Sequence, residues 1–276
     1  MQDIDDYFDL AASIGSHVIF ITEWVDEVPD STVTLLMSKA REHDLAFHLY
    51  LSPIAISATR DAPAIPSTVS GTSFGDASVR HAFKDKALDL AALGPDLLGL
   101  GTEVNFLAAN ATEFAHYVTL YQEAVSVVKA AYPAQKCTLS FQWDRLLTGG
   151  DFTPLTAFTG LPDVWAFTTY PSSFGDSSLI PSAYYSSMRS ILPTQTLGFS
   201  EVGWGATDAA SEIQQAAFWA RLPTLMRDVS PSFISMSLMH DVTLFTGPLE
   251  SLNHTGVRNI DGTPKPAWDV TTHLVF

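Results

Sequence analysis

The sequence has little cysteine, little positive charge and no long apolar run. Cys137 is the single cysteine in 276 residues, so no disulfide can form within the chain. Only 14 Lys and Arg stand against 30 Asp and Glu, which gives a formal net charge of −16. This charge argues against nucleic acid, an anionic membrane surface or a polyanionic substrate, because each of these binds through Lys and Arg. A neutral polymer such as a polysaccharide meets no such repulsion.

Several motifs that would point to other functions are also missing. No apolar stretch reaches the length of a membrane-spanning helix, and no signal peptide opens the chain. No His-x-His pair or cysteine cluster indicates a metal site, and no Gly-x-Gly-x-x-Gly or Walker pattern follows a strand. The sequence therefore predicts no metal, no cofactor and no membrane partner.

The chain does contain a regular alternation of strand and helix patterns, with no break in composition that would mark a second domain. Apolar periodicity and turn residues predict strands at 17–24, 45–53, 97–105, 136–144, 164–171, 197–201 and 233–241. They predict helices at 5–14, 31–43 (capped by Ser31), 79–93, 111–132, 152–158, 181–192, 208–229 and 264–276. The loop at 53–78 is too long to be a mere connector, so we expect it to form a cleft wall or a lid.

This alternation predicts an α/β fold, a (β/α)8 TIM barrel in one domain over residues 1–276 that lacks or truncates its first strand. Because an open barrel exposes two unpaired edges, we expect the first strand, with a signal peptide before it, to lie upstream of Met1. Two alternatives are that residues 1–6 pair weakly with the edge, or that a partner chain covers it. We expect a monomer unless a second chain pairs with that edge.

Two of the predicted strands end on a glutamate, in Leu98-Gly-Leu-Gly-Thr-Glu103 and in Leu197-Gly-Phe-Ser-Glu201. The two glutamates are 98 positions apart, which leaves room for about three strand–helix units. Active sites of this fold lie at the carboxyl ends of the strands, and a pair of carboxylates is what cleavage of a glycosidic bond requires. Either glutamate alone could instead belong to a structural ion pair.

In these motifs the chain resembles the clan A glycoside hydrolases, which are retaining enzymes built on a (β/α)8 barrel. Gly101-Thr-Glu103 is similar to the fourth-strand motif and Phe199-Ser-Glu201-Val-Gly-Trp204 to the seventh-strand motif. The resemblance implies that Glu103 is the acid/base and Glu201 the nucleophile. Thr169-Tyr170-Pro171 resembles the sixth-strand motif, whose tyrosine hydroxyl bonds the nucleophile, and 261–268 resembles the stretch before the final helix. The strand endings lean toward the endo-β-1,4-galactanase and endo-β-mannanase branches.

The chain also departs from the pattern of the clan. Thr102 stands where the clan usually has an asparagine that contacts the sugar 2-hydroxyl, and Asn105 is the candidate substitute. The arginine often found on the second strand has no counterpart in 17–24. The eighth-strand tryptophan is absent, and Met239, His240 and Asp241 occupy its region. These departures concern the identity of the substrate more than the class of reaction.

Further candidates for substrate binding lie near the predicted strand ends. Aromatic rings there can stack on sugar faces or plug the mouth of the barrel, and polar side chains can hydrogen-bond hydroxyl groups. Beyond Tyr170 and Asn105, the candidates are Trp24, His48, Gln142, Trp143, Trp204 and His240.

The leading prediction is a retaining glycoside hydrolase that acts inside a neutral β-linked polysaccharide by double displacement, with carboxyl groups about 5–5.5 Å apart. Its function would place it outside the cell. A second hypothesis is a carbohydrate-binding pseudoenzyme, motivated by Thr102 and the absent arginine. A third is an unrelated barrel enzyme such as a lyase or an isomerase, which the lack of a phosphate-binding glycine loop disfavours.

Overall fold

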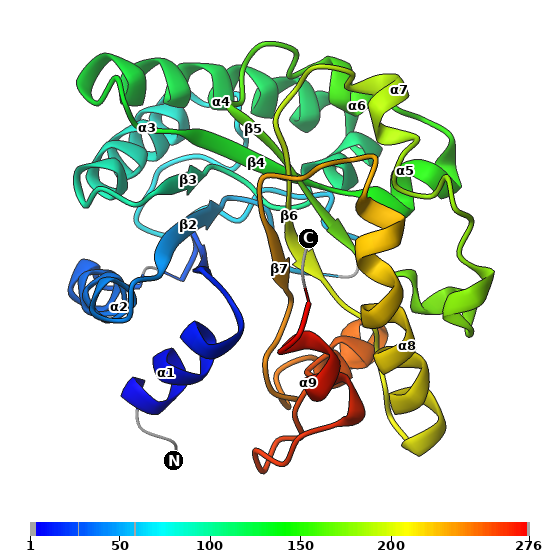
Figure 1. Ribbon diagram of the computed structural model, residues 1–276. Coiled ribbons are helices and arrows are strands. Elements are labelled where there is room, and N and C mark those ends of the chain that lie inside the picture. Colours follow the sequence, from blue (N-terminus) through cyan, green and yellow to red (C-terminus); the bar gives the residue numbers. More distant parts are fainter. Residues whose placement is uncertain (1–3, 27, 58, 275–276) are drawn as a thin grey trace. The chain divides into compact units, whose positions relative to one another are not determined.

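The computed structural model describes residues 4–26, 28–57 and 59–274 (Figure 1). Within these ranges seven strands form one sheet, in which they follow each other in the order β1 to β7. β1 pairs with β2, β2 with β3, β3 with β4 and β6 with β7, each time in parallel. Helices connect the strands, so the fold is that of a (β/α)8 TIM barrel with one strand fewer among the described residues, as the sequence predicted.

The chain divides into two compact units, residues 1–166 and 167–276. β5 (Val164–Thr169) contributes its first half to the first unit and its second half to the second. The single domain expected over 1–276 stays a prediction.

The first unit contains four whole strands with their helices, and Figure 1 shows β2, β3 and β4 side by side in its blue-to-green part. Its elements are α1 (Ile4–Ile14), β1 (His17–Glu23), α2 (Asp30–Glu42), β2 (Ala46–Ser52), α3 (Ala77–Ala92), β3 (Leu97–Gly99), a 3₁₀ helix (Val104–Ala109), α4 (Ala111–Ala131), β4 (Cys137–Gln142), α5 (Trp143–Gly149) and α6 (Thr153–Thr156). Six of the seven residues of β2 are buried. Such a strand is typical of a parallel sheet covered on both faces.

The second unit holds the end of β5, then short 3₁₀ helices at Pro171–Phe174 and Ser177–Leu179, α7 (Met188–Ile191), β6 (Leu197–Val202), α8 (Ala209–Met226), β7 (Ile234–Met236), a 3₁₀ helix (Gly247–His254) and α9 (Pro266–Thr271). α8 begins with a capping box, in which the Asp208 carboxylate accepts the Ser211 N–H at 2.8 Å and the Ser211 hydroxyl accepts the Asp208 N–H at 3.0 Å. Reciprocal caps of this kind satisfy N–H groups that the first turn leaves unpaired.

Four local expectations were wrong. The strand expected at 97–105 stops at Gly99, because Gly101 has a φ of +147° that an extended strand does not allow. The strand expected at 233–241 is only Ile234–Met236, and its pairing with β6 has a register shift. The helix expected at 181–192 is reduced to α7, since its first half is rich in Ser and Tyr, which favour helices weakly. Ser31 lies inside α2, whose N-cap is Pro29.

The two ends of the chain bear on two further expectations. Residues 4–6 belong to α1, so they do not pair as an edge strand, and residues 1–3 lie outside the described ranges. The last helix ends at Thr271, and residues 275–276 of the expected helix 264–276 also lie outside the described ranges.

Candidate active site

Glu103 lies after β3, in a segment shaped by two glycines. A Cβ atom at Gly99 would collide with the ring of Tyr50, and one at Gly101 would collide with the hydroxyl of Tyr117. That hydroxyl donates a hydrogen bond to the carbonyl of Leu100. The glycines therefore let two tyrosines pack against the backbone.

The backbone of Glu103 has a left-handed conformation, with φ 49° and ψ 41°, where it caps the 3₁₀ helix Val104–Ala109. A residue other than glycine pays on the order of 1–3 kcal/mol for such a conformation, which persists only where its surroundings hold it. Here the Glu103 N–H donates to Ser140 Oγ of β4 at 3.0 Å, and the Thr102 hydroxyl donates to Ser52 Oγ of β2 at 3.0 Å. Neighbouring strands on both sides thus fix the residue that the sequence singled out.

Asn105 completes this attachment through its side-chain amide. Its Oδ1 accepts the N–H of Gln142 at 2.8 Å, and its Nδ2 donates to the carbonyl of Gln142 at 3.2 Å. Asn105 is 4% exposed. Its amide group is engaged by the backbone at the end of β4, and its role as the amide that binds a sugar hydroxyl stays a prediction. The Gln142 side chain as a substrate ligand stays a prediction.

Sequence reasoning missed the cation that accompanies Glu103. Arg60 forms an ion pair with the Glu103 carboxylate, which is 3% exposed, while the Arg60 side chain is 12% exposed. Arg60 comes from the long loop after β2 and is the single Lys or Arg in residues 53–78. A guanidinium group that forms an ion pair with a carboxylate favours its ionised form. The sequence did contain a signal for this ion pair, because a buried carboxylate needs a partner and the loop after β2 contains one cationic residue.

A second arginine lies close to the same place. The guanidinium of Arg145 in α5 lies 4.3 Å from the ring centre of Phe106, and that of Arg60 lies 5.7 Å from it. Phe106 belongs to the 3₁₀ helix that Glu103 caps. We call Arg60, Phe106 and Arg145 the arginine–phenylalanine cluster.

In the second unit Glu201 lies near the end of β6, and Tyr170 directly follows β5. The Tyr170 hydroxyl donates a hydrogen bond to Glu201 Oε2. Gly203 makes room for the tyrosine, since a Cβ atom there would lie 2.6 Å from Tyr170 Cε1. The structure therefore brings together the two residues that the sequence motifs paired.

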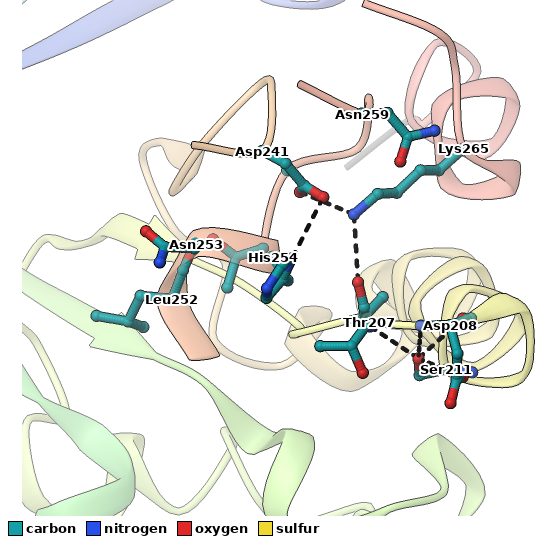
Figure 2. A network of polar contacts seen from close by, with 12 residues as sticks. Thr207, Asp208, Ser211, Asp241, Leu252, Asn253, His254, Asn259 and Lys265 are labelled. Carbon is teal, nitrogen blue, oxygen red and sulfur yellow. Dashed lines mark hydrogen bonds and ion pairs between the residues drawn. The ribbon is translucent and has the colours of Figure 1, made fainter. Parts of the chain in front are cut away.

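Figure 2 shows a polar network around Asp241, beyond the end of β7. Lys265 Nζ lies 2.8 Å from Asp241 Oδ1 and 3.5 Å from the carbonyl of Ala206, and His254 Nδ1 lies 3.7 Å from Asp241 Oδ2. The Lys265 side chain is 1% exposed. A buried ammonium needs such partners, and they connect the segments after β6 and β7 to the start of α9.

The three tryptophans proposed to stack on sugars are buried. Trp24 is 2% exposed and makes an edge-to-face contact with Phe83 of α3, with ring centres 5.0 Å apart. Trp204 is 2% exposed and stacks on Phe218 of α8 at 5.2 Å. Trp143 has no exposed surface. A role as open sugar platforms was wrong for all three, because Trp24 and Trp204 fill the layer between strands and helices and Trp143 is enclosed.

The two candidate histidines lie in different places. His48 is the third residue of β2 and stacks on His17, the first residue of β1, with ring centres 4.9 Å apart, so it lies toward the start of its strand, and its role in binding stays a prediction. Burial lowers the pKa of His48 to about 3 and that of His17 to about 4. His240 follows β7 and pairs through its backbone with Arg258. Burial, followed by the charge of Arg258, lowers the pKa of His240. Its role in binding stays a prediction.

The described residues contain no group of three or more His, Cys, Asp or Glu side chains placed to hold a metal ion. None of the described helices combines the length and apolar character needed to cross a membrane.

Solved structures of glycoside hydrolases share this fold. An exo-β-1,4-mannosidase from Opitutaceae bacterium strain TAV5 superposes with a TM-score of 0.78 at 17% identity, over 98% of this chain and 54% of its own. A family 39 glycoside hydrolase from Bacteroides cellulosilyticus WH2 gives 0.70 at 16% identity, over 98% of this chain and 60% of its own. The GH53 catalytic domain from Ignisphaera aggregans gives 0.69 at 16% identity, over 98% of this chain and 88% of its own.

These similarities confirm the resemblance to the clan A glycoside hydrolases at the level of the fold. They do not single out a branch of the clan. The chain spans about half of the mannosidase that it matches, 54% of its length. No protein-family model matches the sequence, and no curated protein matches it.

Proposed function

We propose that this protein is a retaining β-glycosidase in which Glu103 is the acid/base and Glu201 the nucleophile. The observation that carries the proposal is the hydrogen bond from the Tyr170 hydroxyl to Glu201. A phenol that donates to a strand-end carboxylate stabilises its ionised form, which is the form that attacks as a nucleophile. The fold shared with glycoside hydrolases supports the same class of reaction.

The reaction proceeds by double displacement. The Glu201 carboxylate attacks the anomeric carbon while Glu103 gives its proton to the departing glycosidic oxygen, so the C–O bond to the leaving group breaks as the ester bond to Glu201 forms. Water then gives a proton to Glu103 and attacks the anomeric carbon, and the ester bond breaks. The two inversions give net retention. This mechanism requires the two carboxyl groups to approach to about 5–5.5 Å.

We further propose a largely neutral β-linked polysaccharide as substrate, cleaved within the chain. The net charge of −16 disfavours a polyanion, and the long loop after β2 offers a wall for an extended cleft.

A specific observation also favours the pseudoenzyme. Arg60 engages the carboxylate that must act as an acid, and Asn105 is occupied by the backbone of Gln142. A barrel with such a site could bind a sugar chain without cleaving it.

The test is hydrolysis of galactan, mannan, xylan and glucan by the wild type, Glu201→Gln and Glu103→Gln. Glu42→Gln is the matched control, because Glu42 ends α2 and pairs with Lys39 on the surface. We expect Glu201→Gln to abolish cleavage. Glu103→Gln should lose activity on polysaccharide but retain more on aryl glycosides with acidic phenols, whose departure needs little protonation.

Proton NMR of the first product distinguishes the stereochemical outcomes. We expect the β-anomer to form first, before mutarotation. An α-anomer would overturn the assignment of Glu201 as nucleophile. Binding of a polysaccharide without cleavage by any of the proteins would establish the pseudoenzyme.

A further inference from the structure

The arginine–phenylalanine cluster is unusual for this chain. Basic residues are scarce, 14 Lys and Arg in 276 residues, yet two of them converge on the ring of Phe106. Arg60 also pairs with the candidate acid/base Glu103. Positive charge therefore gathers next to a candidate catalytic residue in a protein with a net charge of −16.

The two arginines differ in what they bind. Arg60 is mostly buried and neutralises Glu103. Arg145 is exposed, and among the described residues it has no carboxylate within ion-pair distance; its guanidinium rests on Phe106. A guanidinium whose central carbon lies over an aromatic ring can still donate hydrogen bonds from its N–H edge. Carboxylate and sulfate groups match that edge with two parallel hydrogen bonds.

We propose that the arginine–phenylalanine cluster binds an anionic substituent, a carboxylate or a sulfate ester, on the sugar substrate. This inference rests on the proposed function and deepens it. An acid/base delivers its proton to the glycosidic oxygen, so groups beside Glu103 face the leaving part of the substrate. The preferred substrate is then a largely neutral chain whose leaving-group side carries an acidic sugar.

The position of Arg60 gives this preference a consequence for catalysis. Arg60 stabilises the ionised form of Glu103, whereas the first step of the reaction requires Glu103 to carry a proton. An anion bound at the cluster competes with Glu103 for the Arg60 guanidinium. An anionic substrate thereby favours protonation of the acid that cleaves it more strongly than a neutral substrate does.

The experiment measures binding rather than turnover. D-Glucuronate, D-glucose 6-sulfate and D-glucose are titrated by NMR into the wild type, Arg145→Gln, Arg145→Lys and Arg41→Gln. Arg41→Gln is the matched control, because it removes the same charge at a different place. Arg41 donates a hydrogen bond to the carbonyl of Gly94, before β3 begins. Far-UV circular dichroism verifies that each variant is folded.

We expect at least one anion to bind the wild type about 10-fold or more tightly than glucose, as a charge-assisted hydrogen bond implies. Arg145→Gln should remove most of this preference, Arg145→Lys should keep part of it, and Arg41→Gln should leave it unchanged. If D-glucuronate binds more tightly than D-glucose 6-sulfate, the substituent on the substrate is the carboxylate of a uronic acid. If D-glucose 6-sulfate binds more tightly, the substituent is a sulfate ester. Equal binding of anions and glucose, or a preference that survives Arg145→Gln, overturns the proposal.

Because no hydrolysis is measured, the result is independent of the proposed reaction. If the protein binds anions preferentially but cleaves no polysaccharide, the anion site is supported and the proposed enzymatic reaction is refuted. If it cleaves neutral polysaccharide but shows no preference for anions, the reaction is supported and the anion site is refuted.

Discussion

Replacing Asn105 with alanine separates two roles for this side chain. In the structure, the Asn105 amide makes two hydrogen bonds with the backbone of Gln142, at 2.8 and 3.2 Å. These bonds attach the segment that carries Glu103 to the end of β4. If that is the role of Asn105, its loss should lower stability first and activity as a consequence. If Asn105 instead contacts a sugar hydroxyl, its loss should lower activity alone.

The magnitude follows from the groups left behind. The substitution leaves the Gln142 N–H without its acceptor, and an unsatisfied buried donor costs about 1–3 kcal/mol. The second bond and the small void left by a side chain that is 4% exposed add to this cost. Partial access of water to the Gln142 backbone reduces it. We therefore expect a loss of about 2 kcal/mol in the free energy of unfolding.

The assay is urea unfolding followed by circular dichroism, together with kcat and KM on the best polysaccharide. Asn259→Ala is the matched control, because Asn259 makes an exposed hydrogen bond to Thr263, and its loss should cost less than about 0.5 kcal/mol. An Asn105→Ala protein as stable as the wild type but with greatly reduced kcat/KM would refute the structural role and restore the sugar-binding one.

Three other changes have defined outcomes. Tyr170→Phe removes the hydroxyl that donates to Glu201, so kcat/KM should fall about 10–100-fold while the melting temperature stays nearly constant; an unchanged rate would contradict the proposed orientation of the nucleophile. Burial lowers the pKa of His48 to about 3, below the value of about 6.5 expected in the unfolded chain, which therefore takes up a proton first as the pH falls. The contribution of His48 to the free energy of unfolding should thus be constant above about pH 7 and fall by about 2 kcal/mol between pH 7 and 5, and His48→Gln, measured by urea unfolding, should reduce the pH dependence of the protein's stability. Lys265→Met leaves Asp241 without its cation and should cost about 3–5 kcal/mol, whereas adding Asp241→Leu should recover part of the loss; thermal unfolding of both proteins measures the difference.

The fold was largely predictable because its signal is repeated along the chain. Alternating strand and helix patterns correctly predicted the seven strands of the described residues. The Gly-x-Glu103 and Ser-Glu201 motifs correctly predicted the strands near whose ends the two glutamates lie. Strand lengths were less predictable. The sequence Leu-Gly-Leu-Gly reads as a buried strand, but the close approach of two tyrosines and the positive φ of Gly101 end it early, and neither depends on local hydrophobicity.

The direction and partners of side chains near the site were harder to predict. Trp24 and Trp204 lie close to strand ends as expected, yet both rings pack against helices. A one-residue difference decides which face of a strand a side chain takes, and the pattern loses this information where a strand becomes a loop. Arg60 was missed for a related reason, since a loop has no periodicity that predicts where its residues reach.

The contact of Tyr170 with Glu201 and that of Arg60 with Glu103 fit two chemical roles. Tyr170 gives Glu201 a neutral donor on the end of a strand, which favours an anion while adding no charge that could neutralise it. Glu103 has a cation from a long loop, and a cation of this kind can exchange one anion for another. A nucleophile must remain ionised, whereas an acid/base must change its protonation during each cycle. The proposed exchange of Arg60 from Glu103 to a substrate anion would provide that change where it is needed.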